Sequence, residues 1–368
     1  MAQGKKNIAI IIPGGIGTGH NNIGVPVLER IIKLLSADFN LTVFQLYKVN
    51  ENFSVAGFEL IDIHSPYPII KNIKFLFVFW KIQRQRKFQA VHGFWSFPCG
   101  FFAVLFGKVF RMRSIVSVLG GDAIALPEIQ YGQLLNPLKR KLILWTLRQA
   151  DEVNALTQYL IDNLSKHGLK RNDAKIIPWG IDTTLFTFSE KPLSETVQFL
   201  HIGNLHPVKD QKTLLKAFKI ISDKIFAQLT IIGEGISDTE VRNLISHLEL
   251  QNKVTIRGLL PYEELPAYYK HADVLLHTSL SEGQSEVVTE AMSCGVLVCG
   301  TQVGLLYDLP NCCLSVPVQD FEALGNAVLK LLSNPQRMKE IRSDAYAWAK
   351  NHTIHWTAKQ IKELYNLS

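Results

Sequence analysis

The chain has 368 residues, of which 47% are hydrophobic and 19% are charged. This composition is typical of folded globular proteins and excludes a disordered chain, and the length suggests about two domains, each with its own core. Lysine and arginine (39) outnumber aspartate and glutamate (32), giving a net charge of +7. That modest excess suits an anionic ligand or an anionic membrane surface and is too diffuse to indicate nucleic acid.

Features of the chain's ends and cysteines predict its compartment. No apolar run approaches the roughly 20 residues that span a bilayer, and the run behind Lys5 and Lys6 is too short for a signal peptide. The five cysteines form no C-x-x-C pair, and Cys312 is adjacent to Cys313, which favours reduced thiols. We therefore expect a cytoplasmic protein without a membrane span.

A predicted buried strand, residues 8–12, opens the chain and is followed by a glycine-rich loop, 13–20, and an amphipathic helix. This order is the first unit of a doubly wound α/β fold. The loop is not a dinucleotide fingerprint, because Asn22 stands where the third glycine of G-x-G-x-x-G would be. A tight turn with positive φ angles explains only some of its glycines.

Residues 72–88 alternate aromatic bulk with a basic cluster. They predict either a core helix with a basic exposed end or a helix lying on an anionic membrane near a lipid-linked acceptor. We favour the core helix, because the aromatic residues are not confined to one side of it.

Two later strands of the first half end in polar residues. His92 lies in a predicted strand at 90–96, and Asp122 follows a predicted strand at 115–119. A lone histidine at a strand end is as often structural as functional, and Asp122 could equally cap the next segment.

A second series of strands and helices begins at residue 197. Gly203 and Lys209 follow the predicted strand 197–202, ahead of a predicted helix at 211–221. A lysine at a helix start lies at the unfavourable end of the helix dipole unless an anion is present. The alternative is a solvated lysine.

Residues 281–299 are the most informative stretch. They form a polar turn with Glu282, a predicted helix from 285 to 294 that Gly295 closes, and a buried strand; another buried strand precedes them.

The chemistry of this stretch lies in its helix start and two carboxylates. Backbone N–H groups of residues 284–287 would form a helix N-terminus suited to a diphosphate. Glu282 and Glu290, eight residues apart, could accept hydrogen bonds from sugar and ribose hydroxyls. Solvated glutamates on a surface helix are the alternative.

The pattern Glu282-Gly283 … Glu290-Ala291-Met292 … Gly295 resembles the E-x7-E signature of retaining glycosyltransferases of family 4. The similarity is weak over the first 90 residues and clear from about Leu147 onward. It implies an α/β protein of the GT-B fold, with two Rossmann-like doubly wound domains facing a central cleft. The implied domains are residues 1–188 on the acceptor side, 189–345 on the donor side, and a helix at 346–368 that returns to the first domain.

The resemblance also implies an activity, that of a hexosyltransferase-type glycosyltransferase (EC 2.4). Such an enzyme moves a sugar from a nucleoside-diphosphate-sugar donor to a hydroxyl of a saccharide or lipid-linked saccharide, in surface polysaccharide or glycolipid assembly. Association with the inner face of the membrane is compatible with it; no nucleic acid, cofactor or metal is expected. Two alternatives stay open: a GT-B nucleotide-sugar epimerase, and a non-catalytic protein that binds a nucleotide-sugar or a partner.

The residues that match the family's motifs take its roles. Lys209 would neutralise the diphosphate, Glu282 would orient the donor sugar and Glu290 would hold the ribose. Asn204 stands where the family has an arginine, and Leu119 where several relatives have a histidine that touches the donor sugar. The candidate catalytic residues are Lys209 and Glu282. The candidate donor-binding residues are Gly14, Gly15, Gly203, Lys209, Arg257, Glu282, Gly283, Gln284, Ser285, Glu286 and Glu290. The candidate acceptor or sugar contacts are His20, His92, Gly121 and Asp122.

Overall fold

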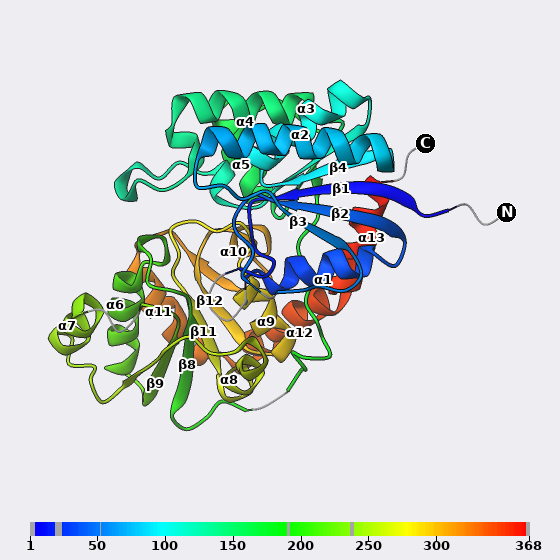
Figure 1. Cartoon of the computed structure of the whole chain (residues 1–368). Coiled ribbons are helices and arrows are strands. Elements are labelled where there is room, and N and C mark those ends of the chain that lie inside the picture. The colour runs from blue at the N-terminus through cyan, green and yellow to red at the C-terminus, as the bar shows by residue number, and fades with distance from the viewer. Residues whose placement is uncertain (1–3, 19–23, 52, 190–191, 236–238, 366–368) are drawn as a thin grey trace. The chain divides into compact units, whose positions relative to one another are not determined.

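The computed structural model describes residues 4–18, 24–51, 53–189, 192–235 and 239–365. The chain divides into two compact units, Met1–Trp179 with Ile354–Ser368, and Gly180–Thr353 (Figure 1). Each unit holds one sheet whose neighbouring strands are all parallel. The predicted α/β class with two doubly wound units is confirmed.

The first unit has a seven-stranded sheet in the order β3-β2-β1-β4-β5-β6-β7. Its strands are β1 (Lys6–Ile12), β2 (Phe39–Gln45), β3 (Glu59–Asp62), β4 (Ala90–Phe94), β5 (Arg113–Val118), β6 (Glu152–Ala155) and β7 (Lys175–Ile176). Its α-helices are α1 (Pro26–Leu35), α2 (Pro68–Arg86), α3 (Phe101–Phe110), α4 (Pro137–Gln149), α5 (Gln158–Lys166) and α13 (Ile354–Leu364).

Strand β1 shows why helices cover both faces of this sheet. Ile8, Ile10 and Ile12 belong to a core cluster that α1 and α13 share, whereas Ala9 and Ile11 belong to another cluster that includes residues of α2 and α3. Successive side chains of a strand point to opposite faces, so a run that is apolar at every position needs cover on both.

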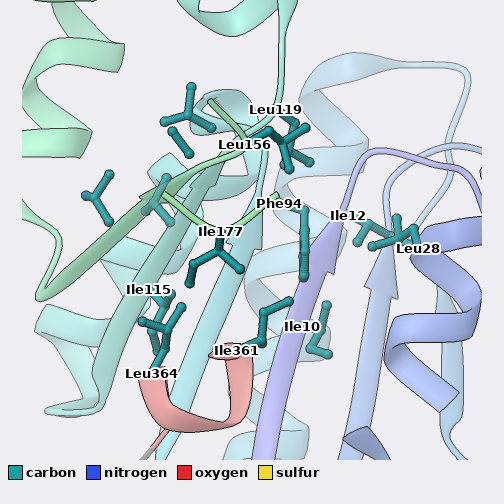
Figure 2. Close-up of a cluster of buried hydrophobic side chains, with 14 of the residues drawn as sticks. Ile10, Ile12, Leu28, Phe94, Ile115, Leu119, Leu156, Ile177, Ile361 and Leu364 are labelled. Atoms are coloured by element: carbon teal, nitrogen blue, oxygen red, sulfur yellow. The ribbon is translucent and has the colours of Figure 1, made fainter. Parts of the chain in front are cut away.

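Helix α13 completes the core of the first unit from the far end of the chain. Ile361 and Leu364 are fully buried and share a cluster with Ile10, Phe94 and Ile115 (Figure 2). The helix also packs against α1. Residues at the two ends of the sequence therefore form one hydrophobic core.

The second unit has a six-stranded sheet in the order β10-β9-β8-β11-β12-β13. Its strands are β8 (Val197–Ile202), β9 (Ala227–Ile232), β10 (Val254–Arg257), β11 (Val274–His277), β12 (Leu297–Thr301) and β13 (Leu314–Val316). Its α-helices are α6 (Gln211–Ser222), α7 (Thr239–His247), α8 (Leu265–His271), α9 (Glu286–Cys294), α10 (Leu305–Asp308), α11 (Phe321–Leu332) and α12 (Pro335–Asn351).

The unit boundaries differ from the predicted ones, at Trp179 rather than 188 and at Thr353 rather than 345. Residues after Trp179 join the second unit because Phe186 is fully buried in its core, with its ring against Tyr269. Helix α12 continues to Asn351, and its Ala349 is buried in the same cluster.

Each sheet has one switch point, where the order of strand addition reverses. It lies between β1 and β4 in the first unit and between β8 and β11 in the second. Open α/β sheets bind ligands beyond the carboxyl ends of the strands at such points. The loops after these four strands are therefore the expected ligand-binding positions. Across the described ranges, no helix is both long enough and apolar enough to cross a bilayer.

Candidate functional site

Lys209 and Glu282 meet at the switch point of the second sheet. Lys209 ends a short 3-10 turn, Pro207–Lys209, that follows β8, and Glu282 lies in the loop that follows β11. Because β8 and β11 are neighbours, the two loops are adjacent, and Lys209 Nζ lies 2.6 Å from Glu282 Oε1. The alternative of a solvated lysine does not hold, since its side chain is only 22% exposed.

Glu282 is held by more than the lysine. Ser279 Oγ donates to Glu282 Oε1 at 2.6 Å, and His277 Nε2 lies 3.6 Å from the same oxygen. Burial raises the pKa of the Glu282 carboxyl, but the charge of Lys209 and the hydrogen bonds from Lys209 and Ser279 outweigh that effect and lower it. Glu282 is therefore an ionised carboxylate at neutral pH.

Two buried imidazoles lie beside this ion pair. Burial lowers the pKa of His277 to about 3 and that of His201 to about 4, so both are neutral at pH 7. His201 Nδ1 lies 2.9 Å from the carbonyl oxygen of Leu276, which can only accept, so Nδ1 carries the proton. Among the residues that the structure describes, Nε2 of each histidine has no hydrogen-bond partner.

Sequence reasoning missed His201, His277 and Ser279. His201 lies in β8, His277 ends β11 and Ser279 follows it. They could have been found as polar residues at the carboxyl ends of buried parallel strands, the rule that selected His92 and Asp122.

Helix α9 begins beside Glu282, as the sequence predicted, although its first residue is Glu286 rather than Ser285. Ser285 precedes the helix with a φ of 77°, and its own side chain makes no capping hydrogen bond. Gly295 closes it in the left-handed conformation, with a φ of 78°.

The loop before α9 packs tightly against a second loop. A Cβ at Gly304 would lie 2.9 Å from the carbonyl oxygen of Gln284 and 3.0 Å from Cβ of Glu282, and Gly304 has a φ of 54°. Glycine is therefore required at that position. The site thus combines a lysine, an ionised carboxylate and a helix N-terminus, which together suit an anion that also carries hydroxyl groups.

Glu290 is inside α9 and is 2% exposed. Tyr269 of α8 donates a hydrogen bond of 2.6 Å to Glu290 Oε2, and Tyr269 is itself fully buried. The alternative of a solvated surface glutamate is therefore wrong. The role of Glu290 as a ribose contact stays a prediction.

The other candidates of the second unit lie at strand ends as well. Gly203 follows β8, where a Cβ would lie 3.5 Å from Lys209 Cδ. Arg257 is exposed at the end of the edge strand β10, two strands away from β8. Asn204 accepts a hydrogen bond from Glu234 N at 2.9 Å and so ties the loop after β8 to the loop after β9. Asn204 thus stabilises the conformation of these loops and supplies no positive charge.

In the first unit, Gly14 and Gly15 follow β1 at the switch point and are buried. A Cβ at Gly14 would lie 3.0 Å from the Tyr47 ring, and Gly15 has a φ of 109° with Val25 3.0 Å from the position of its missing Cβ. Gly15 therefore meets the expectation of a tight turn. His20 of the same loop lies outside the described residues.

His92 is a correction to the predicted set of sugar contacts. It is fully buried, and its two ring nitrogens lie 2.7 Å from Tyr365 Oη and 2.7 Å from Ser117 Oγ. Burial lowers its pKa to about 3. Because both nitrogens are in use inside the core, His92 holds α13 to the sheet and is not placed to touch a ligand.

Asp122 is corrected in the same way. Oδ2 accepts from Ser96 N and Ser96 Oγ, each at 2.7 Å, while Oδ1 accepts from Leu119 N at 3.2 Å and Gly120 N at 2.9 Å. The buried carboxylate therefore fastens the loops after β4 and β5 to each other. Gly121 lies beside Tyr131, whose hydroxyl would be 3.2 Å from a Cβ there.

Metal ligation was not expected from the sequence. Within the described ranges, no three His, Cys, Asp or Glu side chains are grouped so that they could hold a metal ion.

Two protein families match the chain. The family "Glycosyl transferases group 1" matches residues 183–348, and "Glycosyltransferase Family 4" matches residues 19–185. Together these matches run from residue 19 to residue 348 and include most of both structural units.

Individual relatives and solved structures are similar to the chain as well. N-acetyl-alpha-D-glucosaminyl L-malate synthase of Bacillus anthracis is 24% identical over 306 residues, which are 79% of this chain and 76% of that protein. Sucrose-phosphate synthase of Thermosynechococcus elongatus superposes with a TM-score of 0.79 at 20% identity, covering 98% of each chain. The Anabaena protein HepE, in complex with UDP and glucose, superposes with a TM-score of 0.73 at 19% identity, covering 97% of this chain and 98% of its own.

Proposed function

The chain belongs to glycosyltransferase family 4 and has the GT-B fold of a transferase, and from that premise we propose that it uses a nucleoside-diphosphate-sugar donor. It transfers the sugar to a hydroxyl acceptor with retention at the anomeric carbon. The acceptor is a saccharide or a lipid-linked saccharide, in the assembly of surface polysaccharide or glycolipid. The complex of HepE with UDP and glucose supports the donor class.

The observation that carries the proposal is the ion pair between Lys209 and Glu282 beside the start of α9. A diphosphate leaving group develops negative charge as the bond to the sugar breaks. Lys209 and the backbone N–H groups at the start of α9 would stabilise that charge, because their orientation is already fixed.

The remaining candidates take roles around this centre. Glu282 accepts hydrogen bonds from the donor sugar, and Glu290 holds the ribose. Arg257 contacts the nucleobase; strands β10 and β11 are three steps apart, about 14 Å, which is comparable to the length of a nucleoside diphosphate. Gly14 and Gly15 lie against a phosphate or the acceptor. The reaction needs no cofactor or metal, and the protein works in the cytoplasm.

The test is a thermal-shift panel of UDP-, GDP- and ADP-sugars on the wild type, Lys209→Ala and Glu290→Ala. A ligand that binds only the folded protein at a hundred times its Kd stabilises it by about 2.7 kcal/mol, which is a clear shift in Tm. We expect the sugars of one nucleotide to raise the Tm of the wild type and to leave the Tm of both site variants unchanged.

Lys212→Ala is the matched control, because Lys212 is an exposed lysine in the first turn of α6, three residues after Lys209. No shift with any donor, or a full shift in Lys209→Ala, would reject the donor site. Turnover of the donor sugar without an acceptor would indicate an epimerase instead. Binding without transfer to any acceptor would indicate a binding protein.

A further inference from the structure

Helix α2 has two apolar faces on opposite sides. Phe75 and Phe79 are fully buried, and Phe79 stacks on Phe106 with 3.8 Å between ring centroids. The opposite face carries six apolar side chains that are 42% to 76% exposed, which we call the α2 stripe. The α2 stripe consists of Ile69, Ile70, Ile73, Leu76, Phe77 and Trp80.

Helical geometry makes the stripe continuous. Two adjacent pairs, Ile69 with Ile70 and Leu76 with Phe77, are joined through Ile73 and Trp80 by spacings of three and four residues, so all six share one broad side of the helix. From Ile69 to Trp80 the stripe is about 16 Å long at 1.5 Å per residue. Isolated exposed apolar residues are normal on a protein surface, whereas a contiguous set marks an interaction site.

The charged residues of α2 itself are all cations. Helix α2 contains no aspartate or glutamate and five cations, Lys71, Lys74, Lys81, Arg84 and Arg86. Lys74 Nζ donates to the carbonyl oxygens of Asp62 and His64, and Arg84 lies 4.6 Å from the centroid of the Trp80 ring. Arg86 lies by helical spacing on the side of Phe75 and Phe79, away from the stripe, and pairs with Glu59 at 2.8 Å.

We propose that the α2 stripe docks the protein on an anionic lipid surface. The helix lies flat, with its apolar side chains at the boundary between headgroups and acyl chains and its lysines and arginines on lipid phosphates. The charge decides the occupant, because Lys74, Lys81 and Arg84, which flank the stripe on a helix without carboxylates, complement an anionic surface. This inference does not rest on the donor chemistry proposed above.

Docking through α2 also bears on the acceptor. Lys71 lies 5.8 Å from the centroid of the Tyr47 ring, and that ring packs against Gly14 in the loop after β1. The first turns of α2 are thus beside the switch point of the first sheet. A lipid-linked acceptor held at the membrane surface would be close to that loop.

The test is co-sedimentation of the full chain with vesicles of phosphatidylcholine alone and of phosphatidylcholine mixed with phosphatidylglycerol. We expect binding to the mixed vesicles that weakens as salt is added. Ile73→Ser/Phe77→Ser should weaken it about tenfold or more by removing apolar burial. Lys74→Gln/Lys81→Gln should weaken it about 25-fold, at about fivefold for each lysine near an anionic surface.

Matched variants elsewhere control for general loss of surface hydrophobicity or charge. Phe226→Ser removes an apolar side chain of the second unit that is 82% exposed, and Lys330→Gln/Lys350→Gln removes two exposed lysines there. Equal binding to both vesicle types, no binding to either, or equal loss in these controls would overturn the proposal. Self-association that Ile73→Ser/Phe77→Ser abolishes, without vesicle binding, would assign the stripe to a second copy. Thermal shifts with the donor are measured on the same samples, so that failure of the donor site is distinguished from failure of membrane docking.

Discussion

Glu282 receives two hydrogen bonds on one oxygen, from Lys209 and from Ser279. The lysine comes from a loop 73 residues earlier in the chain, so the pair also fastens the loop after β8 to the loop after β11. The ion pair holds Lys209 in position before a ligand arrives. A bound diphosphate would then compete with Glu282 for the lysine.

Replacing Glu282 with glutamine tests this residue directly. The amide keeps the size of the side chain but removes the charge and one acceptor, so the lysine loses its ionic partner and the sugar loses a strong acceptor. We expect kcat/KM for sugar transfer to fall about a hundredfold or more, the range seen when one oriented electrostatic group is removed.

Glu322→Gln is the matched control, because Glu322 is an exposed glutamate in the first turn of α11. Steady-state kinetics on both variants separate a site effect from a general effect of charge. Activity near the wild-type level in Glu282→Gln would contradict the role assigned to this carboxylate.

At the scale of elements, α13 is a part of the first unit that lies at the end of the sequence. Leu364 is fully buried in the core cluster that includes Ile10 and Ile115, whereas the adjacent Glu363 is exposed. We expect Leu364→Ala to lower the free energy of unfolding by about 2–5 kcal/mol, because it leaves a cavity that the core cannot fill. Urea unfolding measures the change.

Glu363→Ala serves as the control for that experiment and should stay within about 0.5 kcal/mol of the wild type. A small effect of Leu364→Ala would mean that the first unit is stable without the contacts of α13.

Helix α2 shows how one element can mislead sequence analysis. The sequence favoured a core helix with a basic exposed end, because the aromatic residues are not confined to one side. That interpretation accounts for the buried Phe75 and Phe79 and not for the exposed α2 stripe. Opposite apolar faces cancel in any measure of one-sidedness. The pattern could not distinguish a helix buried on all sides from one that is buried on one side and exposed on the other.

For the whole molecule, three buried neutral histidines predict sensitivity to acid. Burial lowers the pKa of His92 to about 3, of His277 to about 3 and of His201 to about 4, from a usual value of 6.5. Below pH 6.5 the unfolded chain binds protons at these positions and the folded chain does not. Stability is therefore complete above about pH 6.5 and falls as the pH falls towards 4.

Each of these imidazoles contributes a slope that approaches about 1.4 kcal/mol per pH unit within that window. The second unit contains two of them and the first contains one, so we expect the second to lose stability faster. Urea titrations at about pH 7, 6 and 5 measure the slope, and a flat profile would show that the imidazoles are protonated in the folded protein.

The sequence by itself determined the succession of strands and helices. An apolar run predicted β8 at its observed bounds, and the glycine at 295 predicted the end of α9. These features depend on neighbours within one or two turns of chain, which a linear pattern records. The same local rule placed Lys209 and Glu282 at strand ends, because both follow buried strands directly.

Only the tertiary structure decided which of those residues meet. Strand order makes β8 and β11 neighbours and thereby joins Lys209 to Glu282, and it leaves Arg257 on the edge strand. It also joined His92 to Tyr365, 273 residues away, and so gave a core role to a histidine that could have been a ligand contact. The physical reason is that side-chain chemistry is a property of the residue, whereas its partners are set by burial and strand pairing across the whole chain.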